Sequence, residues 1–391
     1  MSHSLTSATI KVILSLAVFL TSLQLLSYFY TPSIGYVRPR LAKTTYAAEL
    51  LTRTPSRTPG VVPKIFHQSW KSLELPTKFQ EWSLSCRQKH KGWEWVVWTD
   101  EDNLRLVQQH FPWLEDVYNG LPGVIYRADL ARHLYMYIYG GVYADLDTEC
   151  LHPTEDLQHE YGPIFGKSKT PLPDRAIFGR MGTNPDFEHS IPNAWMAATP
   201  GHPFFLLAIQ HVMSIYNETK SQNKIGTPES VTGPIALRDS IIKYEEDKIR
   251  QGPALGDSIK YLTSVGPFAQ DQAENHEVLL LPSHLIYPYS WAYGGEDVRG
   301  DCWVLHDTYN AETCKEKLGT EQAGSICITY WSHTHAGAGH IRLEKQDTAA
   351  AGVDRALRYR RESEGPAMYI CITSGRQYAY LNRYSKVAYR H

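Results

Sequence analysis

The stretch YIYGGVYADLDTEC, Tyr137–Cys150, carries the pattern that decides the fold. A hydrophobic run ends in two glycines, and after a short aromatic segment Asp145 and Asp147 follow one residue apart. The residues before the glycines, 126–139, have apolar side chains at spacings near three and four, which predicts an amphipathic helix that ends at the glycines. VYADLDTE then predicts a short strand. Both aspartates therefore fall at the carboxyl end of a strand, the edge at which open α/β sheets bind ligands.

Paired carboxylates at such an edge favour a metal site. Residues two positions apart on a regular strand lie on the same face of the sheet. At a strand end, where the chain turns, both carboxylates can approach one ion. Hard oxygen ligands suit Mg²⁺ or Mn²⁺, and a site with few protein ligands leaves positions for diphosphate oxygens. An isolated Asp-x-Asp is more often a solvated turn. Here the helix, the two glycines and the aromatic strand form one block with the pair, which favours a functional site.

Residues on either side of this block predict an α/β domain. VPKIFHQSW and WEWVVWTDED each read as a strand, and Thr99 or Asp100 can cap the helix that follows the second one. Farther on, a helix is expected to begin near His202 or Pro203. Strand, helix and strand in this order indicate a parallel sheet.

The amino-terminal residues predict a membrane anchor. Val12–Tyr30 is an uncharged run of 19 residues, close to the roughly 20 that a helix needs to cross the hydrocarbon core. A cleaved signal peptide and a buried core helix are the competing interpretations. Residues 31–60 lack apolar periodicity and are predicted to be a linker. Positive charge is greater after the run than before it, which by itself would place the following domain in the cytoplasm.

Composition narrows the class of protein. The chain has 391 residues, 42% hydrophobic and 20% charged, which is typical of a globular protein. A net charge of -2 gives no reason to expect nucleic-acid binding. The six cysteines are too few for a disulfide scaffold, although Cys302 and Cys314 could pair in an oxidising lumen. Asn217 begins an Asn-x-Thr glycosylation sequon.

The block around the paired aspartates resembles a known family. YRADLARHLYMYIYGGVYADLD is similar to the signature of glycosyltransferase family 32, the sugar-binding region containing the DxD motif. VPKIFHQSW, WEWVVWTDED, NAWMAATPGHPFF and TGPIAL are similar to further blocks of that family in the same order. The resemblance covers about Val61 to His340.

The resemblance implies a fold and a domain plan. We expect a GT-A type, Rossmann-like nucleotide-sugar domain over residues 61–340, built on a mixed, mostly parallel sheet. A short tail (1–11), a transmembrane signal anchor (12–30) and the linker (31–60) would precede it, and an extension without recognisable pattern (341–391) would follow.

The resemblance also implies an activity. We expect retaining transfer of a sugar, with GDP-mannose as donor, a glycan as acceptor and Mn²⁺ or Mg²⁺ as cofactor. Family relatives are Golgi membrane proteins, which overrides the charge count and predicts a single-pass type II protein with a lumenal catalytic domain. Two alternatives stay open: a mannosyltransferase that acts on inositol phosphoceramide, and a non-catalytic subunit of a glycosyltransferase complex.

Roles for the central residues follow from the resemblance. Asp145 and Asp147 would hold the metal, and Arg132 or Arg127 would place a fixed cation near the diphosphate. Asp129 would accept hydrogen bonds from donor-sugar hydroxyls, although Arg127 and Asp129 could instead only cap their helix.

More distant residues complete the candidate set. His67 and Trp70 would lie near the nucleotide base or ribose, and Asn193 and Trp195 near the acceptor. For Trp70, Asn193 and Trp195, a structural role is an equal alternative. His333, His335 and His340 are candidates for a third metal or phosphate contact, of which His335 and His340 are the proposed metal ligands, and each could equally be an ordinary surface histidine. The family often has Ser-Trp near this point, where the present chain has Ala-Gly.

Overall fold

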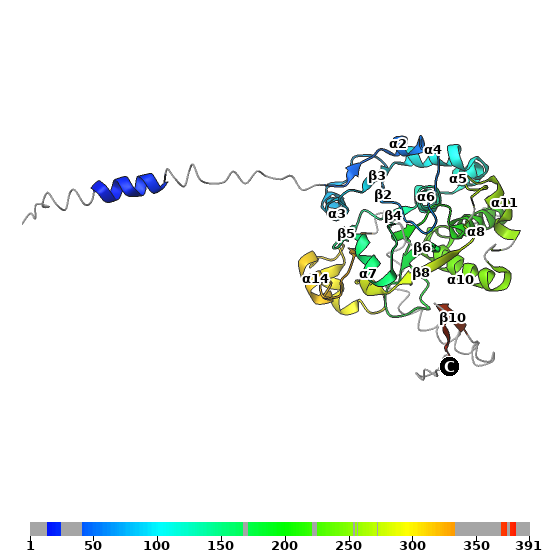
Figure 1. Ribbon diagram of the computed structural model, residues 1–391. Coiled ribbons are helices and arrows are strands. Elements are labelled where there is room, and N and C mark those ends of the chain that lie inside the picture. The colour runs from blue at the N-terminus through cyan, green and yellow to red at the C-terminus, as the bar shows by residue number, and fades with distance from the viewer. Residues whose placement is uncertain are drawn as a thin grey trace, which may run out of the picture. The chain divides into compact units, whose positions relative to one another are not determined.

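The protein is described by a computed structural model (Figure 1). The structure describes residues 14–24, 41–166, 171–220, 225–252, 255, 257–271, 273–332, 369–373 and 376–380. The chain divides into two compact units, Met1–Ser332 and His333–His391.

A seven-stranded sheet forms the centre of the first unit, in the order β1-β3-β2-β4-β7-β6-β8. Its strands are β1 (Lys43–Thr44), β2 (Ile65–Ser69), β3 (Glu94–Trp98), β4 (Gly141–Ala144), β6 (Asp174–Gly179), β7 (Trp195–Ala198) and β8 (His276–Leu281). β7 runs antiparallel to both neighbours, and every other neighbouring pair is parallel. The predicted α/β class with a mixed, mostly parallel sheet is therefore confirmed.

Both faces of the sheet are buried. Val96 and Trp98 of β3 belong to one hydrophobic core and Trp95 and Val97 to another, because successive side chains of a strand point to opposite faces. In Figure 1, α4, α6, α8, α10 and α11 lie to one side of the strands and α3, α7 and α14 to the other. Coverage of both faces leaves the strand ends as the places where a ligand can meet the sheet.

The remaining elements are short or helical. The helices are α2 (Ala47–Leu51), α3 (Thr77–Lys89), α4 (Asp100–His110), α5 (Glu115–Gly120), α6 (Val124–Ile138), α7 (Gln158–Tyr161), α8 (Pro203–Lys220), α9 (Pro228–Val231), α10 (Pro234–Gln251), α11 (Asp257–Val265), α12 (Ser283–Ile286), α13 (Arg299–Cys302) and α14 (Ala311–Leu318). β5 (Thr148–Cys150) and β9 (Cys327–Thr329) form a separate antiparallel pair. In the second unit, β10 (Tyr369–Thr373) and β11 (Arg376–Tyr380) pair antiparallel.

Local sequence accounts for two of the boundaries around the site. Thr99, one of the two caps that the sequence offered, caps α4 through a capping box with Asp102. Gly140 and Gly141, which follow α6, have φ values of +59° and +88°. A side chain at Gly141 would place its Cβ 2.4 Å from the carbonyl oxygen of Ile65, so only glycine permits this approach of β4 to β2.

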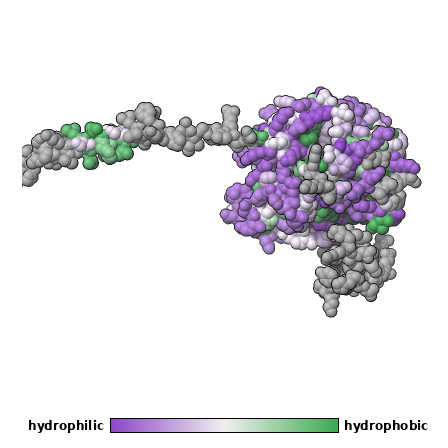
Figure 2. Space-filling model, in the orientation of Figure 1, coloured by the Kyte–Doolittle hydropathy of each residue, from purple (hydrophilic) through white to green (hydrophobic). Residues whose placement is uncertain are grey.

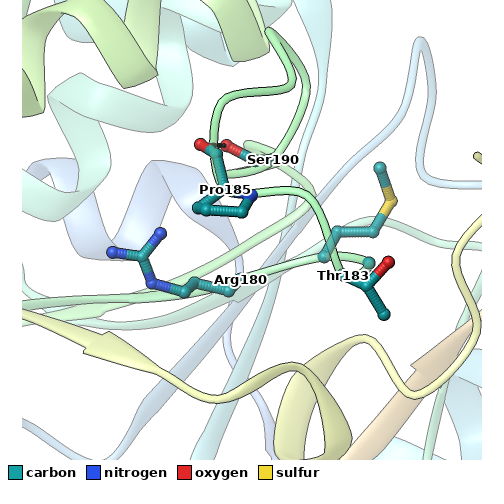
Figure 3. Close-up of a pocket in the computed structure, with 6 residues that line it drawn as sticks. Arg180, Thr183, Pro185 and Ser190 are labelled. Carbon is teal, nitrogen blue, oxygen red and sulfur yellow. Dashed lines mark hydrogen bonds between the residues drawn. The ribbon is translucent and has the colours of Figure 1, made fainter. Parts of the chain in front are cut away.

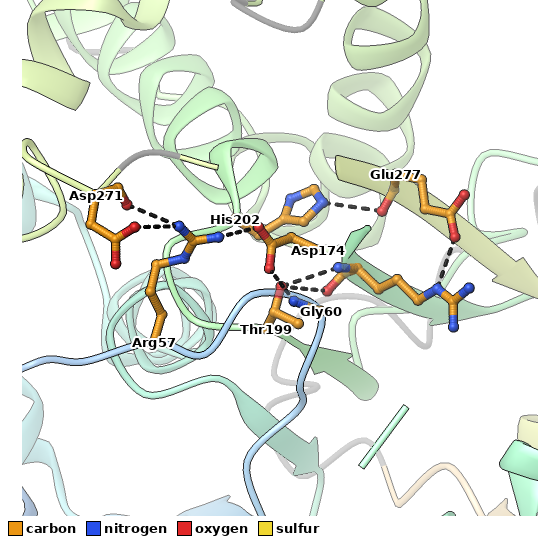
Figure 4. Close-up of polar contacts among 8 residues, drawn as sticks. Arg57, Gly60, Asp174, Thr199, His202, Asp271 and Glu277 are labelled. Atoms are coloured by element: carbon orange, nitrogen blue, oxygen red, sulfur yellow. Dashed lines mark hydrogen bonds and ion pairs between the residues drawn. The ribbon is translucent and has the colours of Figure 1, made fainter. Parts of the chain in front are cut away.

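The predicted linker is wrong over residues 41–60, which belong to the folded unit. β1 pairs with β3, and Leu50 of α2 is completely buried. Arg57 forms a buried ion pair with Asp174 at the start of β6, and the Gly60 N–H donates to the same carboxylate at 2.8 Å (Figure 4). Apart from β1 and α2, residues 41–60 have no regular secondary structure, and they attach to the sheet through individual side chains such as Arg57. Such contacts produce no apolar periodicity in the sequence.

Two disulfides join parts of the first unit. Cys302–Cys314 is the pair that the sequence suggested. Cys86–Cys150 links α3 to β5 across 64 positions and was not anticipated. Cys327 is a buried free cysteine.

Residues 14–24 form a helix with exposed apolar side chains, which Figure 2 shows in the hydrophobic colour. The predicted span, 12–30, extends past this helix at both ends into residues outside the described part. Within the described residues, no helix has both the length and the apolar character needed to cross a membrane.

The Arg57–Asp174 pair yields a stability prediction. Replacement Arg57→Ala leaves the Asp174 carboxylate buried without its cation, and loss of one partner of a buried pair costs about 3–5 kcal/mol. We expect the free energy of unfolding, measured by urea denaturation, to fall by that amount. Arg250→Ala is the control, because Arg250 is 66% exposed and its surface pair contributes at most about 1 kcal/mol. Equal effects of the two changes would contradict the assigned anchoring role of residues 41–60.

Candidate active site

A buried arginine organises the carboxyl edge of the sheet. α6 places Arg132 one turn after Asp129, and the two side chains pair at 3.0 Å with 7% of each exposed. The same guanidinium reaches the Asp145 carboxylate just beyond β4 at 3.1 Å and donates to the Asn193 carbonyl oxygen at 2.8 Å. It also lies over the Tyr143 ring, 4.8 Å from the centroid. One cation thus joins a helix, a strand end and the loop before β7.

Asp129 is enclosed by hydrogen-bond donors. The Asn193 side-chain amide donates to one carboxylate oxygen at 3.0 Å, and the Thr232 hydroxyl approaches the other at 3.4 Å. Burial outweighs the attraction of Arg132 and raises the pKa of Asp129 to about 6. The group is therefore held in a fixed orientation and ionises less readily than an exposed aspartate.

The paired aspartates are held by different contacts. Asp145 accepts a hydrogen bond from the Tyr143 hydroxyl at 2.6 Å, and its backbone N–H donates to the Ala194 carbonyl at 2.8 Å. Asp147 is half-buried, and its carboxylate accepts from the Ser332 N–H at 2.7 Å. Desolvation, followed by the nearby charge of Asp145, raises the pKa of Asp147 to about 6. The two carboxylates therefore lie close enough to repel each other.

This arrangement fits a divalent cation such as Mn²⁺ or Mg²⁺. Both carboxylates offer hard oxygen ligands, and a cation between them would remove their repulsion. One arginine and three aspartates leave the cluster with an excess of negative charge when all are ionised. Within the described residues, no group of three or more His, Cys, Asp or Glu side chains is arranged to hold a metal. The ion would therefore take its other ligands from a substrate, from water, or from residues outside the described part, where His335 and His340 both lie.

His67 does not lie at this site, contrary to the sequence-based expectation. Its side chain is fully buried, its Nδ1 accepts from the Trp98 indole at 3.0 Å, and its Nε2 donates to the Gly140 carbonyl at 3.0 Å. Burial lowers its pKa to about 4, so the ring is neutral. The central position of β2 turns this side chain into the core, where it supports the glycine turn before β4.

Trp195 is also a core residue, with 1% of its surface exposed, so it has no surface with which to contact an acceptor. Its neighbour Asn193 does reach the site, through Asp129 and Arg132. Trp70 is half-buried, and its ring packs edge-on against the Phe79 ring, with 5.4 Å between the ring centroids. These three residues come from strand ends or the adjoining loops, but only the asparagine joins the central cluster.

Two further predicted residues lie on helices. Arg127 is half-buried and donates to the Leu121 carbonyl at 3.2 Å, which ties the first turn of α6 to the preceding loop. Asn217 is exposed on α8. Neither contacts Asp145 or Asp147 through a recorded hydrogen bond or ion pair in the described part of the chain.

The sequence reasoning missed three residues that contact the aspartates. Tyr143 precedes Asp145 by two positions and so shares its face of the strand, a pattern that could have revealed it. Thr232 begins the TGPIAL block, to which no site role was assigned. Ser332 lies 185 positions from Asp147, and no local pattern points to that contact.

Comparisons with known proteins agree with this location. A family model described as "Glycosyltransferase sugar-binding region containing DXD motif" matches residues 76–162, which include α6, β4 and both paired aspartates. "Mannosyl phosphorylinositol ceramide synthase SUR1" of Saccharomyces cerevisiae is 30% identical over 340 residues, 82% of this chain and 81% of that protein.

Two other similarities are shorter or weaker. "Inositol phosphoceramide mannosyltransferase 1" of Schizosaccharomyces pombe is 32% identical over 200 residues, 50% of this chain and 56% of that protein, so the match spans little more than half of its length. A solved structure named "PaToxG Glycosyltransferase" is 14% identical, with a TM-score of 0.33 over 59% of this chain and 88% of that chain. That score is too low to support an argument about the fold.

The buried state of His67 predicts a pH dependence of stability. Its pKa is 6.5 in an unfolded chain and about 4 in the folded protein. As the pH falls from 6.5 to 4, the unfolded chain takes up a proton that the folded state excludes, so the free energy of unfolding decreases, by at most about 3 kcal/mol. His67→Gln keeps a hydrogen-bond donor and an acceptor but does not titrate. We therefore expect the free energy of unfolding of this variant, measured by urea denaturation at several pH values, to depend less on pH than that of the wild type. An equal dependence on pH in both proteins would contradict the assignment of His67 as a buried, neutral histidine.

Proposed function

The chain belongs to the glycosyltransferase family whose sugar-binding region contains the DXD motif, and from this premise we propose that it is a membrane-anchored retaining mannosyltransferase. The proposed donor is GDP-mannose and the proposed acceptor is the head group of inositol phosphoceramide. The names of the two fungal relatives favour this acceptor over the glycan that the sequence first suggested.

The observation that carries the proposal is the Arg132 cluster at the carboxyl edge of the sheet. Arg132 holds Asp129 and Asp145 at 3.0 and 3.1 Å, within the residues that match the family model. The cluster is open to solvent on one side, because Asp145 is 32% exposed at the end of its strand. An open edge with fixed charges suits a substrate whose own charge changes during the reaction.

Each residue of the cluster then has a distinct task. Asp145 and Asp147 would hold a divalent cation, which when bound supplies Lewis-acid stabilisation of the departing diphosphate. Arg132 fixes the Asp145 carboxylate and adds a preorganised positive charge beside it. Asp129, oriented by Asn193 and Thr232, would accept hydrogen bonds from hydroxyls of the donor sugar. Preorganisation of these groups reduces the reorganisation that the reaction would otherwise require.

We further propose that the catalytic unit lies in the Golgi lumen, with type II topology and residues 12–30 as the anchor. Two disulfides support an oxidising compartment, since they are rare in cytosolic proteins. Asn217 is exposed, as a lumenal glycosylation site must be. Residues 14–24 contribute apolar side chains to the proposed anchor.

Transfer with purified components tests the activity. We would incubate the full-length protein in detergent micelles with Mn²⁺ and GDP-mannose labelled in the sugar, and offer inositol phosphoceramide and a mannose-terminated glycan in parallel. We expect labelled mannose on the lipid and its loss with chelator. Labelling of the glycan alone would restore the glycan acceptor. Absence of both transfer and donor hydrolysis, with intact donor binding, would favour a non-catalytic subunit.

The metal assignment predicts the effect of Asp147→Asn. Removing one carboxylate charge should lower kcat/KM by at least about a hundredfold. The free energy of unfolding should change little, because Asp147 is half-buried and its carboxylate is hydrogen-bonded to Ser332, a contact that an asparagine oxygen can still accept. Asp116→Asn, on the exposed surface of α5, is the matched control and should retain full activity. Retention of full Mn²⁺-dependent turnover by Asp147→Asn would contradict the metal site.

A further inference from the structure

A small cavity lies just beyond the carboxyl end of β6. It has a volume of about 160 Å³ and is lined by Arg180, Met181, Gly182, Thr183, Pro185 and Ser190 (Figure 3). In Figure 3, Arg180 extends to the left below Pro185, and Thr183 lies to the right. Whole-ligand pockets usually exceed about 300 Å³, so this volume suits one chemical group of a larger molecule.

The cavity shares an edge with the Arg132 cluster. β4 and β6 flank β7, with Ala144 opposite Trp195 and Phe178 opposite Met196. Asp145 follows the end of β4 and Arg180 follows the end of β6, so the two backbones are two strand spacings apart, roughly 10 Å. A molecule with a ring and an attached anionic group can extend over such a distance.

Tyr287 gives a second link between the two places. It forms a β-bridge with Met181 of the cavity lining, and its hydroxyl donates to the Pro192 carbonyl at 3.2 Å. Burial, and after it contributions that include the charge of Asp145, raise the pKa of this phenol. Tyr287 therefore connects the cavity lining at Met181 to Pro192, which lies in the loop that leads to Asn193 of the cluster.

The cavity wall is held in place by a second loop. The Met181 N–H donates to the Ser190 carbonyl at 2.9 Å, and the Thr183 N–H donates to the Tyr293 carbonyl at 3.2 Å. Gly182 has a φ of +69°, and a Cβ there would lie 2.5 Å from the Tyr293 carbonyl oxygen. These constraints position the lining side chains before any ligand arrives, which lowers the entropic cost of binding.

Charge identifies the class of ligand. Arg180 is the charged residue among the six that line the cavity, and the exposed Asp186 and Glu188 of the same loop are not among them. A guanidinium presents several N–H donors that match phosphate oxygens. The cluster at Asp145 and Asp147 is already assigned to the donor diphosphate, so a cation across β7 suits a second, separate phosphate.

We propose that this cavity is an acceptor subsite in which Arg180 binds the phosphodiester of a cyclitol-phosphate head group. The inference rests on the proposed function, since it assigns the acceptor of the same reaction. The reacting hydroxyl of the cyclitol ring would then extend from Arg180 toward the donor sugar at the Arg132 cluster. Arg180 acts as a specificity-determining residue that distinguishes phosphate-bearing acceptors from neutral ones.

Binding of glycerophosphoinositol, a soluble phosphodiester, tests the proposal without requiring turnover. We would measure its Kd by calorimetry on the full-length protein in detergent, with GDP and Mn²⁺ present. Loss of a hydrogen bond to a charged group should weaken binding by at least about tenfold in Arg180→Ala, with partial recovery in Arg180→Lys. Arg250→Ala removes the same charge from the exposed end of α10 and should leave the Kd unchanged.

Further ligands separate the alternatives. Neutral myo-inositol should bind more weakly than glycerophosphoinositol, and Arg180→Ala should not alter its Kd. If Arg180→Ala weakened the binding of glycerophosphoinositol and myo-inositol equally, Arg180 would contact the ring or support the fold, and the proposal would be wrong. If the variant weakened the binding of GDP to the same extent, Arg180 would belong to the donor site, which would also overturn the proposal. Inorganic phosphate that binds as tightly as glycerophosphoinositol would overturn recognition of a head group. If Arg180-dependent binding occurs but no mannose is transferred, the subsite stands and the proposed activity fails.

Discussion

The guanidinium of Arg132 is the contact on which the candidate site depends. It is 7% exposed and pairs with Asp129 on its own helix and with Asp145 beyond β4. A buried cation is costly unless carboxylates and acceptors surround it, and here two carboxylates and the Asn193 carbonyl do so. Helix α6, strand β4 and the loop before β7 are thereby held together at one point. The charges that the proposed reaction requires are part of the interaction that positions these elements.

The antiparallel direction of β7 determines which segments meet at this point. β4 and β6 end at the edge where β7 begins, so the whole connection from Arg180 to Ala194 lies along that edge. One end of the connection supplies Asn193 and Ala194 to the aspartate cluster, and the other supplies the cavity beside Arg180. A parallel β7 would have required a crossover to the opposite edge before the strand. Sheet topology therefore places the proposed acceptor subsite beside the proposed donor site.

Local patterns predicted the elements around the site but not all of its members. Apolar spacing predicted helix α6, and the acidic pair after an aromatic strand indicated the edge at which Asp145 and Asp147 lie. His67 and Trp195 also occur at or beside strands, yet both are buried in the core. Alternation along a strand shows that a side chain faces one side of a sheet, but both faces of this sheet are covered. The sequence pattern therefore could not distinguish a residue beside the ligand edge from one in the core.

The sequence by itself determined features that depend on neighbours within a few positions: the start of helix α4 at Thr99 or Asp100, the glycine turn after α6, and the acidic pair after β4. Only the tertiary structure decided the partners of those residues. Arg57 meets Asp174 across 117 positions, and Ser332 meets Asp147 across 185. The physical reason is that helix caps and turns are governed by local backbone geometry, whereas a buried charge is satisfied by whichever distant group the packed chain brings within reach.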